Sequence, residues 1–468
     1  MKAPTGAEPA AVRAFGDPVS GGRVVTGDHW LDVPVDAGDP ARGTLRLYAR
    51  EVRAAARVDD DQPYLVFLQG GPGGRSPRPG VDGPGWLAWA LERFRVVLLD
   101  QRGTGRSTPL DRHTLPGIGD ERAQADHLAL HRADAIVDDA EALRRHLLGD
   151  VPWTALGQSF GGFCTWTYLS CAPQGLAAAY VTGGVPPMGA HPDDVYRATH
   201  ADLERRVADL DAAHPRVRAV LAEVAHHVAQ VPEHLPTGER LTVRRLQEIG
   251  IVLGGAGGPD QLAHLADDAW ALSGRRLSDT FLAAITVILS FATNPLYALL
   301  HEASYAEGGL ATCWSARRVR AALGVPDEPV READGVERLP LTGEMIYPET
   351  LRTDPALAPL AGVGELLAER VWDEPLYDAD RLAANQVPVA ACVYTQDMFV
   401  DAALSRATAA RTGGVRLVED AEHHHDGLRR GGADVLGALE RALAGPQPAP
   451  APVGEHHIDR ADPWEAAS

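Results

Sequence analysis

The sequence predicts an α/β fold, with a mostly parallel central sheet flanked by helices and a large helical cap domain inserted into it. Apolar runs such as YLVFLQ (64–69) and RVVLLD (95–100) each end in a glycine-rich turn. A continuous apolar run is typical of a strand buried on both faces of a sheet. These runs alternate with helical patterns, and that alternation indicates βαβ units and a parallel sheet.

Length and composition narrow the class of protein. The chain has 468 residues, enough for two or three domains. Its net charge of −20 argues against nucleic acid and anionic membrane surfaces as partners. The 4 cysteines lack metal-binding spacing, and we find neither a signal-peptide core nor a long uncharged apolar stretch. We therefore expect a cytoplasmic protein; the composition leaves its oligomeric state open.

The first part of the sheet is expected over residues 21–185, after a loose Ala/Pro/Gly-rich segment over 1–20. The run GTLRLYAREV alternates like a half-buried strand, and the two apolar runs follow it. ADAIVDDAEALRRHLLG has apolar residues at helical spacing and a glycine stop. A short apolar run at 153–156, a helix over 163–169 and the strand AAAYVTGG complete this part.

The cap domain is expected over residues 186–375, where a long helical stretch begins at DDVYRATHADLERRV. Buried-strand character returns at VPVAACVY and GVRLVED, and ADVLGALERALA is a closing helix, so residues 376–445 form the second part of the core. The Pro/Ala-rich tail over 446–468 is expected to be disordered. Ligands of such sheets bind beyond the carboxyl ends of the strands, so the cap is expected to face that edge.

The motif Gly157-Gln158-Ser159-Phe160-Gly161 lies where an apolar run ends. A motif of this kind occurs by chance in a chain with 48 glycines, so one interpretation is an ordinary strand-to-helix turn. The functional interpretation is a nucleophile elbow, in which a serine sits on a strained turn between a strand and a helix. Both flanking elements are predicted here, so we interpret Ser159 as a candidate nucleophile.

A serine nucleophile needs an imidazole base and a carboxylate that orients it. Asp397 follows one late strand, and His425 is the last of three histidines after the next, which is the chain order serine, acid, histidine. His424 and Asp401 are the alternatives, and Asp401 also suits the first turn of a following helix. Without the serine motif, HHH would be interpreted as a solvated loop or an adventitious metal site.

An oxyanion hole requires two backbone N–H groups near the serine. We predict that Phe160 supplies one and that Gly71, in the turn QGGPGG after an early strand, supplies the other. The segment DQRGTGRS (100–107) is interpreted as a structural ion-pair loop in which Asp100 and Arg102 or Arg106 brace the pocket.

The segments QGGPGG, DQRGTGRS, GQSFGG and TGGVPP occur in this order and precede the Asp397/His425 pair. Together they resemble the prolyl aminopeptidase (proline iminopeptidase) family of α/β-hydrolase serine peptidases over about residues 40–440. One departure is Gln69, where the family commonly has histidine. That residue shapes the oxyanion loop and is outside the triad, so we expect activity to survive.

The resemblance implies release of an N-terminal residue, preferentially proline, from short peptides through a Ser-His-Asp triad and an acyl-enzyme, with no cofactor or metal. It also implies cap glutamates that hold the substrate's free ammonium. The candidates are Glu302 and Glu344, which stand in semi-apolar settings beside Tyr305 and Tyr347. The two tyrosines are candidates for packing on the pyrrolidine ring of the substrate. The alternative functions are an esterase or amidase for a small non-peptide substrate and a non-catalytic binding module. Convergence of both glutamates near Ser159 would separate the peptidase from the esterase.

Overall fold

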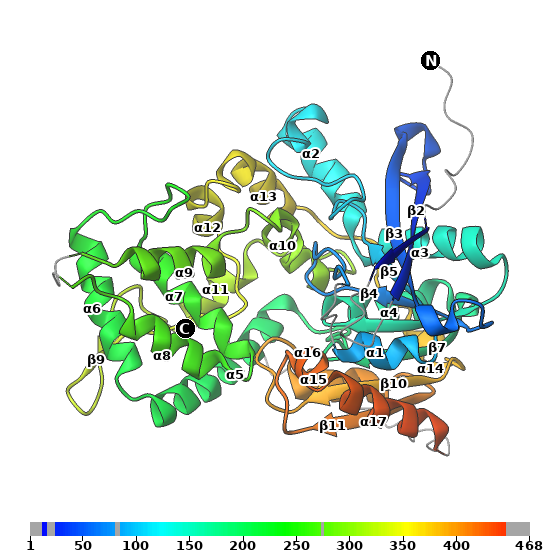
Figure 1. The fold of residues 1–468 in the computed structure, drawn as a ribbon. Helices are drawn as coiled ribbons and strands as arrows, with labels where there is room; N and C mark the ends of the chain where they lie inside the picture. Colours follow the sequence, from blue (N-terminus) through cyan, green and yellow to red (C-terminus); the bar gives the residue numbers. More distant parts are fainter. Residues whose placement is uncertain (1–11, 16–23, 80–84, 273–275, 446–468) are drawn as a thin grey trace, which may run out of the picture.

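The computed structural model describes residues 12–15, 24–79, 85–272 and 276–445. These residues form a large sheet with helices on both faces and, beside it, a body made mostly of helices (Figure 1). The predicted α/β architecture is confirmed.

The described part of the chain forms a nine-stranded sheet in the order β1-β2-β3-β5-β4-β6-β7-β10-β11. The first three pairs are antiparallel, and every pair from β5 to β11 is parallel. Parallel strands end at one edge, so the turns after β4, β6, β10 and β11 open on the same side. The strands are β1 (Val12–Phe15), β2 (Val24–Pro34), β3 (Thr44–Ala54), β4 (Tyr64–Leu68), β5 (Arg95–Asp100), β6 (Trp153–Gln158), β7 (Leu176–Thr182), β10 (Val389–Tyr394) and β11 (Val415–Asp420).

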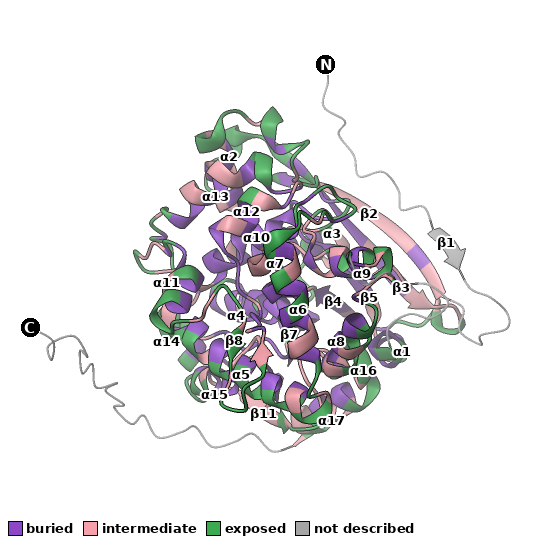
Figure 2. Ribbon diagram, turned by 90° about the vertical axis from the view of Figure 1, so that its left-hand side faces the viewer, coloured by how far each residue is buried: buried purple, intermediate pink, exposed green. Residues whose placement is uncertain are grey.

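Two hydrophobic cores lie on opposite faces of the sheet. Along β4, Val66 and Leu68 join the core that includes α3 and α4, whereas Leu65 and Phe67 join the core that includes α1 and α17. Successive side chains of a strand point to opposite faces, and both faces here are covered, which explains the unbroken apolar runs. Figure 2 shows buried residues concentrated in the interior. The covering helices are α1 (Gly85–Leu91), α3 (Ala133–Leu148), α4 (Phe160–Cys171), α14 (Ala379–Ala383), α15 (Ala402–Ala410), α16 (Gly427–Arg430) and α17 (Gly432–Ala444).

The helical body lies between β7 and β10 in the chain and has a hydrophobic core of its own. Its predicted first long helix is divided in two, because Pro215 lacks the N–H that would continue a helix. A two-stranded hairpin, β8 (Val330–Arg331) and β9 (Glu337–Arg338), also lies here, and α2 (Glu121–Leu128) packs against α13. The helices are α5 (Pro192–Ala213), α6 (Val217–Gln230), α7 (Val243–Gln247), α8 (Gly258–Asp267), α9 (Asp279–Leu289), α10 (Pro295–Leu300), α11 (Ser315–Ala322), α12 (Pro348–Thr353) and α13 (Ala361–Ala368).

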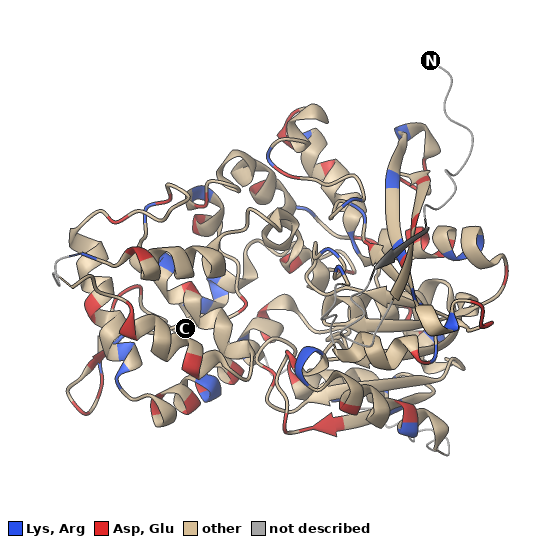
Figure 3. Ribbon diagram, in the orientation of Figure 1, with Lys and Arg blue, Asp and Glu red and all other residues tan. Residues whose placement is uncertain are grey.

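The predicted loose segment over 1–20 differs from the structure at Val12–Phe15, which pairs antiparallel with β2. Backbone hydrogen bonds to the open edge of β2 account for this short strand. The rest of that segment, and the predicted disordered tail over 446–468, lie outside the described residues. Charged residues of both signs are spread over the sheet region and the helical body (Figure 3). No helix within the described ranges is both long and apolar enough to cross a bilayer.

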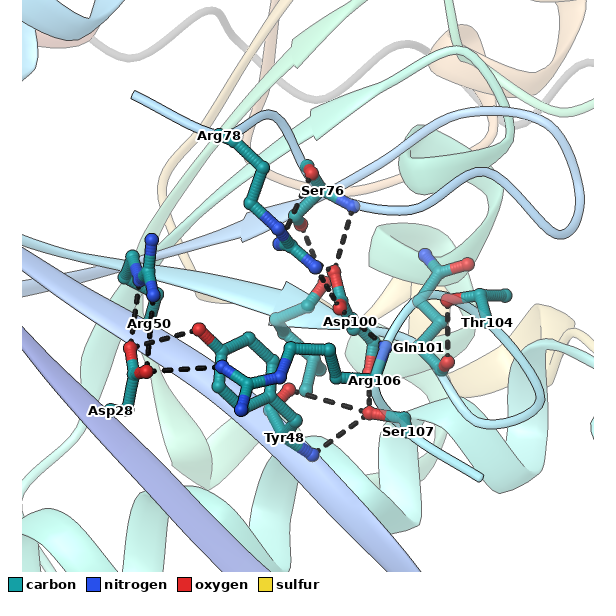
Figure 4. A network of polar contacts seen from close by, with 11 residues as sticks. Asp28, Tyr48, Arg50, Ser76, Arg78, Asp100, Gln101, Thr104, Arg106 and Ser107 are labelled. Carbon is teal, nitrogen blue, oxygen red and sulfur yellow. Dashed lines mark hydrogen bonds and ion pairs between the residues drawn. The ribbon is translucent and has the colours of Figure 1, made fainter. Parts of the chain in front are cut away.

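The turn after β5 is held by a polar network (Figure 4). Asp100 accepts hydrogen bonds from the backbone N–H groups of Ser76 (3.1 Å) and Arg106 (2.9 Å), and it forms an ion pair with Arg78. These contacts agree with the interpretation of DQRGTGRS as a structural ion-pair loop. The ion-pair partner of Asp100 is Arg78, however, and not Arg102 or Arg106. The guanidinium of Arg106 instead reaches Asp28, 3.1 Å away.

Arg102 carries the buried ion pair of this segment. Its Nη2 and Nε lie 2.6 and 2.8 Å from the carboxylate of Asp139 in α3, and the two side chains are only 3% and 1% exposed. The same guanidinium donates to the carbonyls of Val35 and Leu130. This contact ties the turn after β5 to a helix on the face of the sheet.

We expect Arg102→Met to lower the free energy of unfolding by about 3–5 kcal/mol, because it leaves the Asp139 carboxylate buried without its partner. Urea titration measures the loss. Arg106→Met is the matched control: its side chain is 46% exposed, so its pair with Asp28 is worth about 1 kcal/mol or less. Equal losses in the two variants would contradict the assignment of stability to the buried pair.

Candidate active site

Ser159 occupies a strained turn between β6 and α4. Its φ of 55° and ψ of −127° are rare for a residue with a side chain. A Cβ added to Gly161 would overlap the carbonyl of Leu68, and one added to Gly184 would overlap the carbonyl of Ser159. The two glycines thus allow the helix and a neighbouring turn to pack directly against the serine. This is the geometry expected of a nucleophile elbow.

His425 and Asp397 lie beside this serine. His425 Nε2 is 2.9 Å from Ser159 Oγ, and His425 Nδ1 is 2.7 Å from Asp397 Oδ2. The other oxygen of Asp397 accepts the backbone N–H groups of Phe399 (2.8 Å) and Val400 (3.2 Å), which fixes the carboxylate. With Nδ1–H donating to the carboxylate, Nε2 is free to accept the serine proton.

The alternative candidates have other partners. His424 Nδ1 lies 3.2 Å from a backbone carbonyl, and His423 Nδ1 lies 2.8 Å from Asp420. Asp401 caps α15 by accepting the N–H of Leu404 at 2.7 Å, in keeping with a place at a helix start. In the part of the chain that the structure describes, no group of three or more His, Cys, Asp or Glu side chains is arranged to hold a metal ion.

The glycine-rich turn after β4 lies against the elbow. A Cβ added to Gly70 would stand 2.8 Å from Ser159 Cβ, so this turn approaches the nucleophile as closely as the absence of a side chain permits. Phe160 is the first residue of α4, where a backbone N–H has no intrahelical acceptor. From the other side, Asn294 donates to the carbonyl of Pro72 at 3.3 Å. Of the two predicted oxyanion residues, Phe160 directly follows Ser159, and Gly71 directly follows the glycine that contacts it. Their role stays a prediction.

A polar and aromatic cluster of the cap stands over the elbow. Tyr297, His301 and Tyr305 follow one another at intervals of four along α10 and the 3₁₀ turn after it, so they share a face. The Glu344 carboxylate accepts the hydroxyl of Tyr297, and its Oε2 lies 3.7 Å from His301 Nε2. On its other side, His301 Nδ1 lies 3.1 Å from the Tyr196 hydroxyl.

Tyr305 connects this cluster to the elbow helix. Its ring centroid lies 6.0 Å from that of Phe163 in α4 and 5.5 Å from that of His301. Glu344 is 11% exposed and His301 3%. The cap thus places the largely buried Glu344 carboxylate in an aromatic setting, close enough to His425 for their charges to interact.

The other two predicted substrate-binding residues are placed differently. Both oxygens of Glu302 accept backbone N–H groups at the start of α11, from Ser315 (3.1 Å) and Ala316 (2.9 Å). Glu302 is one residue past His301 and so points about 100° away from the face that carries the cluster. Tyr347 is fully buried in the core of the cap, with Arg320 5.3 Å over its ring. The expected convergence of Glu302 and Glu344 near Ser159 is therefore not found, because only Glu344 faces the triad. The contact that was to separate a peptidase from an esterase depends on Glu344 alone.

Sequence reasoning missed Tyr297, His301 and Tyr196. A usable signal existed for the first two, because YALLHEASY places Tyr297, His301 and Tyr305 at helical spacing on one face. Tyr196 lies in α5, far away in the sequence, and no local pattern marks it.

Comparison with known proteins gives the family. Residues 63–424 match the alpha/beta hydrolase fold. The chain is 43% identical over 418 residues to a proline iminopeptidase of Aeromonas sobria, covering 88% of this chain and 95% of the relative. The chain belongs to the proline iminopeptidase family. A proline iminopeptidase of Aspergillus aculeatus is 33% identical over 433 residues, with 89% and 93% covered. The resemblance inferred from the four motifs is confirmed.

Charges around His425 set its proton affinity. Burial lowers the pKa of His425, but the charge and hydrogen bond of Asp397, followed by the charge of Glu344, raise it above the ordinary histidine value. Burial raises the pKa of Glu344, but the hydrogen bond and charge of His301, and then the charge of His425, bring it below the ordinary value. Glu344 is therefore ionised at neutral pH and acts on the histidine.

We expect kcat/KM to fall as pH drops through the raised pKa of His425, since the protonated imidazole cannot accept the serine proton. In Glu344→Gln this acidic limb should move to lower pH, because one of the negative charges that stabilise the imidazolium is gone. A pH–rate profile measures both. The control is Glu349→Gln, which removes a cap carboxylate paired with Arg244 and should leave the limb in place. A limb unmoved in Glu344→Gln would contradict the coupling.

Proposed function

We propose that this chain is a serine exopeptidase that releases an N-terminal residue, preferentially proline, from short peptides. The observation that carries the proposal is the ionised Glu344 carboxylate, held in the cap beside the Ser159–His425–Asp397 chain of hydrogen bonds. Membership of the proline iminopeptidase family supports it. The 4 cysteines, all free thiols, support a reducing compartment such as the cytoplasm.

The proposed reaction uses the groups at the elbow. Ser159 Oγ attacks the carbonyl of the first residue while His425 Nε2 takes its proton. Asp397 keeps the imidazole oriented, and the N–H groups of Gly71 and Phe160 stabilise the negative charge on the carbonyl oxygen. His425 then gives the proton to the leaving amine, and the acyl-enzyme forms. A water molecule, deprotonated by the same imidazole, releases the free amino acid.

Glu344 supplies the requirement for a free N-terminus. A carboxylate at a fixed place relative to Ser159 accepts only a chain whose ammonium lies one residue from the scissile carbonyl. The ammonium of N-terminal proline carries two N–H bonds, and the Glu344 carboxylate has two oxygens to receive them. We place the pyrrolidine ring against Tyr305, whose ring packs on Phe163. Glu302 serves this site indirectly by capping α11.

Substrate hydrolysis tests the proposal. We expect fast cleavage of proline anilide, loss of that cleavage when the amine is blocked, and loss of all cleavage in Ser159→Ala. The panel is proline, alanine, leucine and arginine anilides, N-blocked proline anilide and a short-chain nitrophenyl ester. Activity on the ester but on no anilide with a free amine would contradict the proposal and favour an esterase.

A second experiment tests the ammonium site. We expect Glu344→Gln to lower kcat/KM for proline anilide at least about thirtyfold, as losing one partner of a buried charge pair typically costs about 2–5 kcal/mol. The ester, which carries no ammonium, should lose far less. Glu302→Gln is the comparison: it should lower the melting temperature, because it weakens the cap of α11, more than it lowers kcat/KM. An unchanged rate on proline anilide in Glu344→Gln would rule out this carboxylate as the ammonium site.

A further inference from the structure

Two side-chain amides hold the glycine-rich turn after β4, one on each side of Gly71. On the sheet side, Gln101, from the turn after β5, donates its amide to the carbonyl of Gln69 at 3.0 Å. On the cap side, the amide of Asn294 donates to the carbonyl of Pro72 at 3.3 Å. Gly71 lies between these two carbonyls in the chain, so the two contacts restrict where its predicted oxyanion N–H can point.

Asn294 also begins a cap helix that packs on this turn. It is the N-cap of α10, and its Oδ1 accepts the backbone N–H of Tyr297 at 3.2 Å. The oxygen and the nitrogen of one amide are thus bonded to two different segments, which fixes the orientation of the side chain. A Cβ added to Gly73 would stand 2.5 Å from Asn294 Oδ1 and 2.6 Å from Leu296 Cβ. The turn and the start of α10 are therefore in direct contact.

The same end of α10 supports the proposed ammonium site. The hydroxyl of Tyr297 donates to the Glu344 carboxylate, while its backbone N–H is bonded to Asn294. The ring of Phe291 stacks on that of Tyr297, with centroids 6.0 Å apart, and the Phe291 N–H donates to the buried Asp354 at 2.9 Å. The start of α10 is therefore anchored in the cap and contacts both the oxyanion turn and Glu344.

We propose that Asn294 is a positioning residue for the reaction: by holding the Pro72 carbonyl, it sets the oxyanion turn against Ser159. This role rests on the proposed function, in which Gly71 donates to the carbonyl oxygen of the substrate. An oxyanion hole is effective because its donors are in place before the charge develops, and a small misplacement lowers the rate steeply. Because α10 also supports Glu344, one helix fixes the separation of the oxyanion hole and the ammonium site.

The test is Asn294→Asp, assayed on proline anilide and on the short-chain nitrophenyl ester. Aspartate caps a helix about as well as asparagine, so the melting temperature should stay at the wild-type value. A carboxylate cannot donate to the Pro72 carbonyl. We therefore expect kcat to fall about three- to tenfold on both substrates, as loss of one hydrogen bond typically costs, while KM changes little. Asn294→Ser, an uncharged cap too short to reach the carbonyl, should give the same result.

Ser278→Asp is the matched control. Ser278 likewise caps a helix of the cap, α9, by accepting the N–H of Phe281 at 3.0 Å, and it donates to the carbonyl of Asp268. Both of these partners lie in the cap, so kcat should equal the wild-type value on both substrates. Glu344→Gln provides the contrast, because it should affect the anilide far more than the ester.

Unchanged kcat in both Asn294 variants would overturn the positioning role. A lower melting temperature in both variants would also overturn it, because Asn294 would then serve the fold of the cap. Loss on the anilide alone would mean that Asn294 acts through Glu344 and not through the oxyanion turn. A wild type that cleaves only the ester would refute the proposed peptidase, and kcat on the ester would still decide the role of Asn294. A wild type that cleaves neither substrate would refute both.

Discussion

The conformation of Ser159 is the constraint on which the rest of the site depends. A side-chain-bearing residue held at φ 55° costs about 1–3 kcal/mol and persists only where its surroundings impose it. Here β6 and α4 are anchored in the double-faced core, and glycines at 161 and 184 let neighbouring backbone approach without a collision. The packing of the sheet thus holds Ser159 in its strained conformation. In that conformation the hydroxyl points away from the backbone and toward the imidazole.

Parallel strand order turns this one strained residue into a site. The glycine turn after β4, Ser159 after β6, Asp397 after β10 and His425 after β11 all stand at one edge of the sheet. The cap then closes on that edge from several points. The carbonyl of Gly254, at the end of a 3₁₀ segment of the cap, accepts the N–H of His425 at 3.2 Å, and Phe399 packs edge-on against the imidazole at 4.9 Å. The histidine is therefore positioned by both parts of the molecule.

Charge is distributed unevenly around the nucleophile. Glu344 and His301 form a charged pair in the cap, and the charge of Glu344 acts on His425. In a setting with little water, each fixed charge interacts more strongly than it would at the surface.

Three features of the candidate site could be predicted from the sequence. They are the strand–turn–helix run around Ser159, the glycine turn at 70–74, and the positions of Asp397 and His425 after late strands. Each of these depends on local backbone geometry or on where a strand ends, which the residue pattern reports directly. Other features could not be predicted, because each depends on which distant segment of the chain packs alongside. These are the ion-pair partner of Asp100, the burial of Glu302 and Tyr347 away from the site, and the strand at 12–15.

The sequence by itself therefore determined the fold class, the candidate nucleophile and the chain order of its candidate partners. Only the tertiary structure decided that Glu344 faces the triad while Glu302 caps a helix. It also decided that His301 and Tyr196 support the cap carboxylate. The physical reason is that the cap is a set of helices whose relative rotation is set by packing. Adjacent residues of a helix point about 100° apart, so one side chain can face the site while its neighbour is buried elsewhere.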